Sequence, residues 1–483
     1  MRRVILYIVL CCCLSVRAWD WWPLPMAQPD TCRDSVQYLV SVWATAGSGA
    51  YNTFWLQSEE QGYVSAVPFS GALRAAVLKP ATRPNRWYDY DGAVDIMGMV
   101  HSPLTSSALL SAGPFPVYQG RQGAFIVRQC YAHVRLYIVD ISAGVMNLAD
   151  DMNTPLGTGS LLLSSNAPSM PAIHIGLDRW IPIPGLFGYL EVRGGLTHAW
   201  LTDRIGTRNS KLHYKWAGVQ VGGSLPVNIS YEFHHAAEWG GISPVYGSLG
   251  SGWRDFKHVF LAQGGGVMRN DLVNAQGNHV GSQQLMLTGK GKGWQVNVYW
   301  QNFFEDNFAF IGDGQNITDG LWGISMKQTR WPFIEGVLYE FLNTTDQSGP
   351  WHDRDGLCYA GNDQYYQNGV YRNGWFYYGR SMGTPFISPN NSRVRIHHVG
   401  VRGDIYGFKY RFKASYARNY GNDVTSRKVL STNTAVLLEV SKVVPQAWGL
   451  EFGVRLAGDF GSQFGNNFGA QISIRKRDIL CKW

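Results

Sequence analysis

Charged residues are scarce in this chain of 483 residues, at 16% of the total, against roughly 25% in typical soluble domains. Beyond residue 16 no run of about 18 apolar residues occurs, so a transmembrane helix is not expected. No block of like charges occurs either, which argues against a nucleic-acid-binding tail. The formal net charge of +8 fits anionic partners such as lipid phosphates or acidic polysaccharide, or an unselected surface charge.

Cysteine is rare and widely spaced. Three of the seven cysteines stand together at positions 11 to 13, and the others form no CxxC pair. Zinc binding is therefore not expected, while one or two disulfides of unspecified pairing would fit an exported protein. The four cysteines beyond the N-terminal segment are Cys32, Cys130, Cys358 and Cys481.

Signatures of catalysis and cofactor binding are missing as well. The chain has no GxSxG, no GxxxxGK[ST] and no GxGxxG after a predicted strand. The stretch HHAAE at 234–238 lacks the HExxH order and lies on a predicted strand, so no metal site is expected there. Two carboxylates in HDRD at 352–355 leave an exported glycoside hydrolase as an alternative. We interpret the chain as a protein without enzymatic activity or cofactors.

The N-terminus has the pattern of a cleaved secretory signal. Arg2 and Arg3 precede an apolar segment at 4–16, and VRA at 16–18 resembles a small-residue cleavage site. The apolar segment is too short to span a bilayer as a helix. The expected organisation is a signal peptide at 1–18, a lead segment at 19–35, a β-barrel at 36–477 and a C-terminal tail at 478–483.

Glycine, aromatic residues and two-residue alternation are abundant, with 56 glycines and 14% aromatics. In GWQVNVYWQNFF at 293–304, the apolar residues Trp294, Val296, Val298 and Trp300 take every second place. Alternate side chains of a strand point to opposite faces, so this segment has one apolar and one polar face. The apolar face packs against a second sheet in a soluble sandwich, or against lipid in a membrane barrel. In a large barrel the polar face would line an aqueous lumen.

Roughly sixteen to eighteen such segments of about ten residues recur, the length that a tilted strand needs to cross a bilayer. Soluble strands are usually nearer five or six residues. No fixed repeat of about 40–50 residues occurs, which weakens a soluble propeller. We therefore predict an all-β fold, a transmembrane antiparallel β-barrel. The segments are 36–45, 71–79, 90–100, 125–137, 138–146, 188–200, 212–222, 227–237, 281–300, 319–327, 332–342, 393–420, 434–444, 449–460 and 468–477.

The connections between these segments differ in length. Some are short glycine-rich turns, such as the one at 289–292, and others are long and polar. Short turns on one side and long loops on the other are typical of outer-membrane barrels, so we expect the long loops outside the cell, folding over or into the lumen. The long connections are 101–123, 147–172, 239–280, 302–318 and 343–392.

Several long stretches carry a family resemblance. GSLLLSSNAPSMPAIHIGLDRWIPIPGLFGYLEVRGGLTHAW within 157–200 resembles the capsule assembly Wzi family in its Bacteroidetes form, as do LPVNISYEFHHAAEWGGISP at 225–244 and the long stretch at 339–386. The likeness covers roughly 36–477. It implies an outer-membrane β-barrel of about 18 strands in a Gram-negative cell, acting as a lectin that organises or anchors capsular polysaccharide. The best-studied members of this family also have a periplasmic helical segment. Residues 19–35 contain no convincing counterpart of that segment.

The long loop at 343–392 is the main candidate binding region. Its aromatic residues offer stacking faces for sugars, and its polar residues offer hydrogen bonds to hydroxyls. The alternative is a loop folded into the lumen as a structural plug. Trp239, beside Glu238, is either a sugar platform or a residue of the interfacial aromatic belt. The predicted carbohydrate-binding residues are Trp239, Asp363, Tyr365, Tyr366, Tyr371, Trp375, Tyr377 and Arg380.

Three functions remain open from the sequence. The leading hypothesis is a non-enzymatic outer-membrane barrel whose partners are membrane lipid and surface polysaccharide, with no nucleic-acid partner. The second is a porin-like channel with the same fold. The third is an exported glycoside hydrolase on a soluble β-scaffold.

Overall fold

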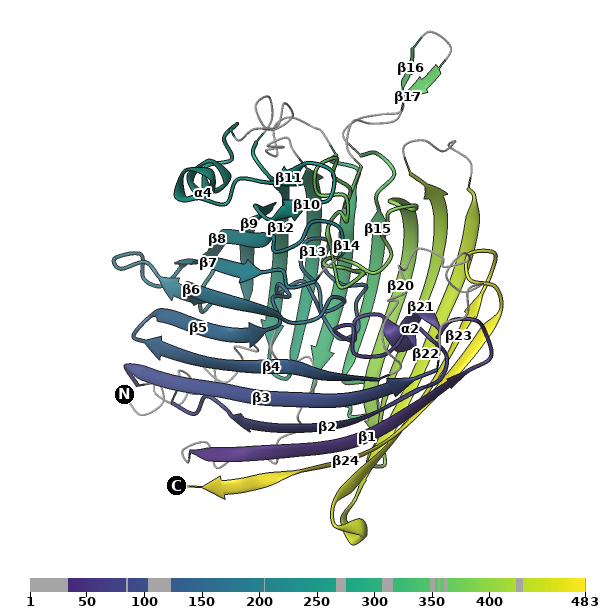
Figure 1. The fold of residues 1–483 in the computed structure, drawn as a ribbon. Coiled ribbons are helices and arrows are strands. Elements are labelled where there is room, and N and C mark those ends of the chain that lie inside the picture. The colour runs from purple at the N-terminus through teal and green to yellow at the C-terminus, as the bar shows by residue number, and fades with distance from the viewer. Residues whose placement is uncertain are drawn as a thin grey trace.

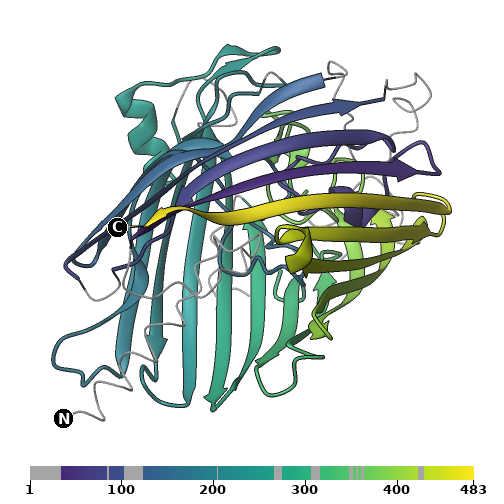
Figure 2. The same ribbon diagram turned by 90° about the horizontal axis from the view of Figure 1, so that it is seen from below.

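A computed structural model describes residues 34–83, 86–102, 123–203, 205–265, 275–305, 316–347, 352–354, 357–359, 364–422 and 429–482. Eighteen strands form one closed antiparallel barrel (Figure 1). Strand β1 (Ser35–Gly47) pairs with β24 (Asn467–Lys482) and closes it, and Figure 2 shows these two strands side by side. The predicted all-β, antiparallel barrel is confirmed. Within these described ranges, no helix is long and apolar enough to cross a membrane.

The remaining barrel strands follow one another around the wall in chain order, with smaller elements inserted in the loops. The barrel strands are β2 (Ser70–Lys79), β3 (Tyr88–His101), β4 (Gly123–Leu136), β5 (Val139–Met146), β6 (Met170–Pro182), β7 (Leu190–Trp200), β8 (Lys211–Val221), β9 (Val227–Trp239), β12 (Asn278–Gly291), β13 (Trp294–Glu305), β14 (Gly320–Gln328), β15 (Gly336–Asn343), β20 (Arg393–Ile405), β21 (Phe408–Gly421), β22 (Ser431–Val444) and β23 (Leu450–Phe460). The inserted elements are α2 (Phe54–Gln57), β10 (Ile242–Ser243), β11 (Gly247–Ser248), α4 (Trp253–Phe260), β16 (His352–Arg354), β17 (Leu357–Tyr359), β18 (Phe376–Tyr377), β19 (Arg380–Ser381) and η1 (Pro445–Ala447).

The outer face of the wall is apolar. Val298 on β13 lies directly between Leu287 on β12 and Ile324 on β14, and all three side chains are exposed on the outside. Trp294 in the same strand is 47% exposed, whereas Gln301 on the opposite face is fully buried. A closed barrel with a continuous apolar outer belt is the surface that lipid requires, because every backbone group is paired within the wall. The alternating segment at 293–304 therefore turns its apolar face outward.

The two ends of the barrel differ as predicted. Turns at 137–138, 292–293 and 406–407 connect strands at one end, which also holds the start of β1 and the end of β24. We call this the short-turn end. The long connections all lie at the opposite end, the long-loop end, because successive strands run in opposite directions. Outer-membrane barrels place short turns in the periplasm and long loops outside.

Two boundaries predicted from the sequence are wrong. The loop expected at 147–172 ends earlier, because β6 begins at Met170. Its alternation was missed because the register shifts between Leu177 and Ile181, which breaks the two-residue period. The barrel also does not end at 477: β24 continues to Lys482, paired with the first residues of β1. The signal peptide at 1–18 and nearly all of the lead segment lie outside the described residues.

The largest hydrophobic core lies inside the barrel rather than between sheets. Three loops of the long-loop end, at 48–69, 147–169 and 364–392, fold into the lumen and pack against the wall. We call these three segments the plug. The prediction of loops folding into the lumen is confirmed. The prediction that the polar face of β9 lines an aqueous lumen is wrong for this part of the wall. The side chains on that face are all buried: Asn228, Ser230, Glu232 and His234.

Candidate functional site

The plug is held together by hydrogen bonds between loops that are distant in sequence. The indole Nε1 of Trp375 donates to the carbonyl oxygen of Leu162 at 2.8 Å. The hydroxyl of Tyr366 donates to the carbonyl oxygen of Leu161. The chain can turn between these two aromatic residues because Gly374 has a φ of +67°, where a Cβ would clash with the carbonyl oxygen of Tyr366. These contacts make the plug one packed unit.

Buried carboxylates anchor the plug to the wall. Glu340 on β15 accepts hydrogen bonds from the Tyr299 hydroxyl at 2.6 Å, from the backbone N–H of Thr158 at 2.7 Å and from the Thr158 hydroxyl at 2.8 Å. Asp319, next to β14, accepts hydrogen bonds from the Tyr365 hydroxyl at 3.0 Å and from the backbone N–H of Gln347 at 2.7 Å. Buried carboxylates need such donors, since an unpaired one is costly.

The first loop of the plug docks on β21, which is separated from β15 by β20 alone. The Trp55 indole in α2 donates a hydrogen bond to the Ser415 hydroxyl at 3.2 Å, and the Nζ of Lys413 lies 3.5 Å from the centre of the Trp55 ring. Arg380 on β19 donates to Gln57 Oε1 at 3.1 Å and to the carbonyl oxygen of Val64 at 3.1 Å. Burial lowers the pKa of Arg380 to about 10.

The structure brings six of the eight predicted binding residues into or beside the plug. Their side chains are 0% to 8% exposed, so protein atoms cover the ring faces and the guanidinium. This arrangement matches the structural-plug alternative, and sugar contact by these side chains stays a prediction. Asp363 lies outside the described residues. The six residues are Tyr365, Tyr366, Tyr371, Trp375, Tyr377 and Arg380.

Trp239 lies apart from the other predicted residues. It ends β9 on the outer face of the barrel, where helix α4 covers it (Figure 1). The Phe256 ring of α4 lies 5.5 Å from the Trp239 ring, and the Nζ of Lys211 lies 4.4 Å from its centre. Trp239 therefore lies at the outside of the wall near the long-loop end, with its side chain buried beneath α4, and both of its expected roles stay predictions.

Two further loops contact the plug segment 364–392 at the long-loop end. The Tyr377 hydroxyl lies 2.8 Å from the Thr202 hydroxyl, and the Tyr371 hydroxyl donates to the carbonyl oxygen of Gly240 at 3.3 Å. Residues Arg208 and Ile242 form a backbone bridge between the β7–β8 loop and the β10–β11 hairpin. The loops at 201–210, 240–250 and 366–379 thus share one surface.

This surface exposes aromatic, cationic and amide side chains together. Tyr246 is 40% exposed, Tyr378 is half-buried, and Arg208, Asn209 and Arg372 are exposed. We call these five residues the rim surface. Sequence reasoning missed most of them because nothing in the local pattern shows which loop residues stay outside the packed plug. The signal available in the sequence was the polar stretch TRN at 207–209 together with the aromatic residue in VYG at 245–247, both in predicted loops.

Asp203 lies beneath the rim surface. Its carboxylate accepts a hydrogen bond from the backbone N–H of Tyr378 at 3.1 Å. Burial raises the pKa of Asp203 to about 6, because the ionised carboxylate loses its hydration there. The position of the Tyr378 backbone is therefore coupled to a buried acid.

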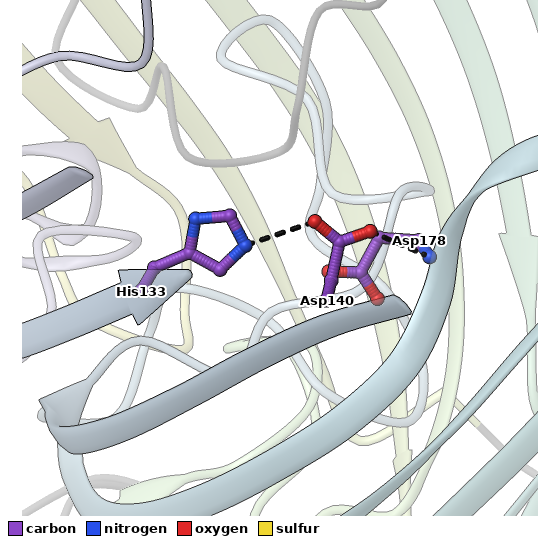
Figure 3. Close-up of side chains that lie close together, drawn as sticks. All are labelled: His133, Asp140 and Asp178. Carbon is purple, nitrogen blue, oxygen red and sulfur yellow. Dashed lines mark hydrogen bonds and ion pairs between the residues drawn. The ribbon is translucent and has the colours of Figure 1, made fainter. Parts of the chain in front are cut away.

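A second polar group lies at the short-turn end of the lumen (Figure 3). His133 on β4, Asp140 on β5 and Asp178 on β6 place their ligand-type atoms within 4.8 Å of one another. The Nε2 of His133 is 2.9 Å from Asp140 Oδ1, and its Nδ1 is 2.6 Å from Asp91 Oδ2. These residues have the chemistry to hold a divalent cation, with Asp91 orienting the imidazole. A histidine between two carboxylates is also a satisfied ion-pair network by itself.

Comparison with known proteins supports the fold. No protein-family model and no curated protein sequence matches the chain. Among solved structures, the chain is similar to Wzi of Escherichia coli, described as an outer membrane protein involved in group 1 capsule assembly and a carbohydrate-binding β-barrel. The TM-score is 0.58 at 12% identity, covering 91% of this chain and 84% of that one.

Two other solved structures align less closely over similar lengths. The chain matches OpdL of Pseudomonas aeruginosa with a TM-score of 0.47 at 9% identity, covering 93% of this chain and 99% of that one. It matches a BenF-like porin of Pseudomonas fluorescens Pf-5 with a TM-score of 0.47 at 10% identity, covering 92% and 99%. At such low identities the similarity to Wzi shows a shared fold, that of an outer-membrane-type β-barrel.

Proposed function

We propose that the chain is an outer-membrane β-barrel that binds surface or capsular polysaccharide and anchors or organises it, without catalysis. The observation that carries the proposal is the plug. Three loops fill the lumen and join the wall through buried hydrogen bonds, and the plug segment 364–392 presents the rim surface together with the loops at 201–210 and 240–250. A rigid, closed barrel with a structured outer face suits binding at the cell surface better than transport.

The porin-like channel is the second candidate, and it shares the fold. Conduction needs an open aqueous path, whereas Trp375, Tyr365 and Leu161 are fully buried in the lumen. The plug therefore counts against a channel. The hydrolase hypothesis rested on Asp353 and Asp355 in HDRD, which lie outside the side chains that the structure describes. The hydrolase hypothesis therefore gains no support from the structure. An apolar outer belt also argues against a soluble scaffold, which would expose that belt to water.

The rim surface has the chemistry for sugar contact. Tyr246 and Tyr378 offer ring faces for the CH groups of a pyranose, and Asn209 offers amide hydrogen bonds. Arg208 and Arg372 suit carboxylate or phosphate groups of an acidic polysaccharide. In this proposal the buried residues of the plug hold the surface in place. A polymer would gain affinity through its repeated units, since many barrels can engage one chain.

The test is polysaccharide retention by a rim-surface variant. We expect Tyr246→Ala combined with Arg208→Ala to weaken binding of purified surface polysaccharide by about tenfold, since one stacking contact and one charged hydrogen bond are lost. Tyr406→Ala is the matched control, because Tyr406 is 95% exposed in the turn at the opposite end. A heat-modifiable gel shift checks that each variant folds. Equal binding by the folded double variant and the wild type would contradict the proposed site.

A further inference from the structure

Two arginines stand directly opposite each other on the outer wall near the long-loop end. Arg395 on β20 pairs in register with Arg418 on β21. Val394 and Ile396, which flank Arg395, are fully buried on the inner face, so Arg395 points outward, and both arginine side chains are exposed. Like charges opposite each other across a strand pair are destabilising. Such a pair is expected where a negative partner lies between them.

The rows below the two arginines become steadily more apolar. In the next row, His397 pairs with Tyr416 and with Phe341. In the row after that, Val399 pairs with Ala414 and with Tyr339, and Val399 and Tyr339 are exposed on the outer face. A wall that passes from headgroups into hydrocarbon shows cations first, then aromatic rings, and then aliphatic side chains among the rings. The register therefore places both guanidinium groups at headgroup level.

Neutral groups position the two guanidinium groups without cancelling their charge. Arg395 donates from Nε to Asn343 Oδ1 at 2.9 Å and from Nη2 to the Thr345 hydroxyl at 3.2 Å, using two of its five N–H donors. The Arg418 guanidinium lies 5.7 Å from the centre of the Tyr416 ring. Among the described residues, neither arginine forms an ion pair with a carboxylate, unlike Arg411 and Arg455 in the lumen.

We propose that Arg395 and Arg418 form a binding site for the phosphate of a lipid headgroup in the outer leaflet. The planar guanidinium matches phosphate oxygens with paired hydrogen bonds, and one phosphate between two arginines converts their repulsion into attraction. The aromatic row beneath the arginines points to a lipid as the ligand, because this row can pack against acyl chains. A free phosphate has no acyl chains and would not use that surface. The site rests on the membrane location of the barrel and not on polysaccharide binding.

The experiment measures lipid binding to the detergent-purified protein. The probes are diphosphorylated lipid A and the same lipid without its phosphates, and binding is followed by native mass spectrometry. We expect wild type to retain the diphosphorylated form, and Arg395→Gln with Arg418→Gln to lower its affinity tenfold or more. We expect the lipid without phosphates to bind both proteins equally weakly, and excess inorganic phosphate to compete poorly.

Lys442→Gln is the matched control. Lys442 also lies on the outer wall, over the Phe408 ring, but near the short-turn end. Its loss should leave lipid A binding unchanged. Equal retention of diphosphorylated lipid A by the double glutamine variant and wild type would overturn the proposal. So would equal wild-type binding of the lipid without phosphates, or full displacement by inorganic phosphate. A gel shift of the unheated sample verifies that the double variant is folded.

Discussion

The indole N–H of Trp375 and the carbonyl oxygen of Leu162 are 2.8 Å apart, although the two residues stand 213 positions apart in the chain. Both side chains are fully buried. This hydrogen bond joins two loops that enter the lumen from different strand pairs, β5–β6 and β15–β20. The closed state of the barrel therefore depends on contacts between loops as well as on contacts of each loop with the wall.

Trp375→Ala should loosen the plug. Removing a fully buried tryptophan typically costs about 3–5 kcal/mol, and here the loss falls on the docked loops rather than on the strand ladders. We expect more frequent ion-conducting openings in planar bilayers, and lower polysaccharide retention because the rim surface loses its support. Trp375→Phe keeps most of the ring and should open less often. An alanine variant that conducts like wild type would show that the lumen is closed without this contact.

Glu340→Ala should release the loop at 147–169 from the wall. The substitution leaves the Tyr299 hydroxyl and both donors of Thr158 without their acceptor, at about 1–3 kcal/mol for each buried donor. Hydrogen exchange at residues 154–160 should speed up, while exchange in β14 and β15 stays slow. Glu340→Gln retains one carbonyl acceptor and should have an intermediate effect. Unchanged exchange in the alanine variant would contradict the anchoring role.

Plug docking should strengthen on mild acidification. Burial raises the pKa of Asp150 to about 6, above its ordinary value of 3.8, so the docked loop holds a proton that the free loop releases. The contribution is fully present below about pH 4 and is lost as the pH rises through about 6, a change of at most about 3 kcal/mol. Bilayer openings should therefore be rarer at pH 5 than at pH 7.5.

Asp150→Asn separates this acid from other titrating groups. Asparagine is neutral at both pH values, and its single carbonyl oxygen can still accept the hydrogen bond that the backbone N–H of Met152 donates to Asp150 Oδ1. The Ser160 hydroxyl loses the second oxygen, Oδ2, as its acceptor. The variant should show a smaller pH dependence of bilayer openings than wild type, with Asp203 responsible for part of the remainder. The same pH dependence in both proteins would assign the effect to other groups.

The sequence predicts the wall well because barrel strands obey a local rule. The segment containing Val298 needs only its two-residue period to show which face turns outward. The same rule failed for β6, whose register shift between Leu177 and Ile181 hides the period. It also failed at the end of β24, where Lys476 and Asp478 form an outward-facing ion pair at 3.1 Å that gives the segment a polar character.

The candidate site was harder to predict because it depends on contacts between distant loops. The density of aromatic residues from Tyr365 to Tyr378 correctly marked an ordered loop, but aromatic residues suit a packed core and a sugar platform equally. Whether a ring is covered depends on partners such as Leu162 and Phe303, far away in sequence. Tyr246 was overlooked for the same reason, since its exposure follows from how its hairpin sits on the plug.

Cys130 offers a direct measure of where the outer wall lies. It is exposed on β4, in register between Val94 on β3 and Val145 on β5, within the apolar belt. Cys481 is likewise a free thiol. A variant with Cys32, Cys358 and Cys481 changed to serine should leave Cys130 as the thiol to be labelled in the mature chain. In outer-membrane vesicles, a charged maleimide should fail to label it, whereas an apolar maleimide that partitions into lipid should succeed.

Detergent-free unfolding in urea should abolish the difference between the two reagents, because the thiol then meets water. Tyr406→Cys in the same background is the matched control, since Tyr406 is 95% exposed in a turn beyond the apolar belt. This cysteine should react with the charged maleimide when the reagent has access to the short-turn side of the membrane. Rapid labelling of Cys130 by the charged maleimide in intact vesicles would place this face in water. The belt formed by Val94, Cys130 and Val145 would then have to pack against protein, because an apolar surface in water is unfavourable by about 25 cal/mol per Å².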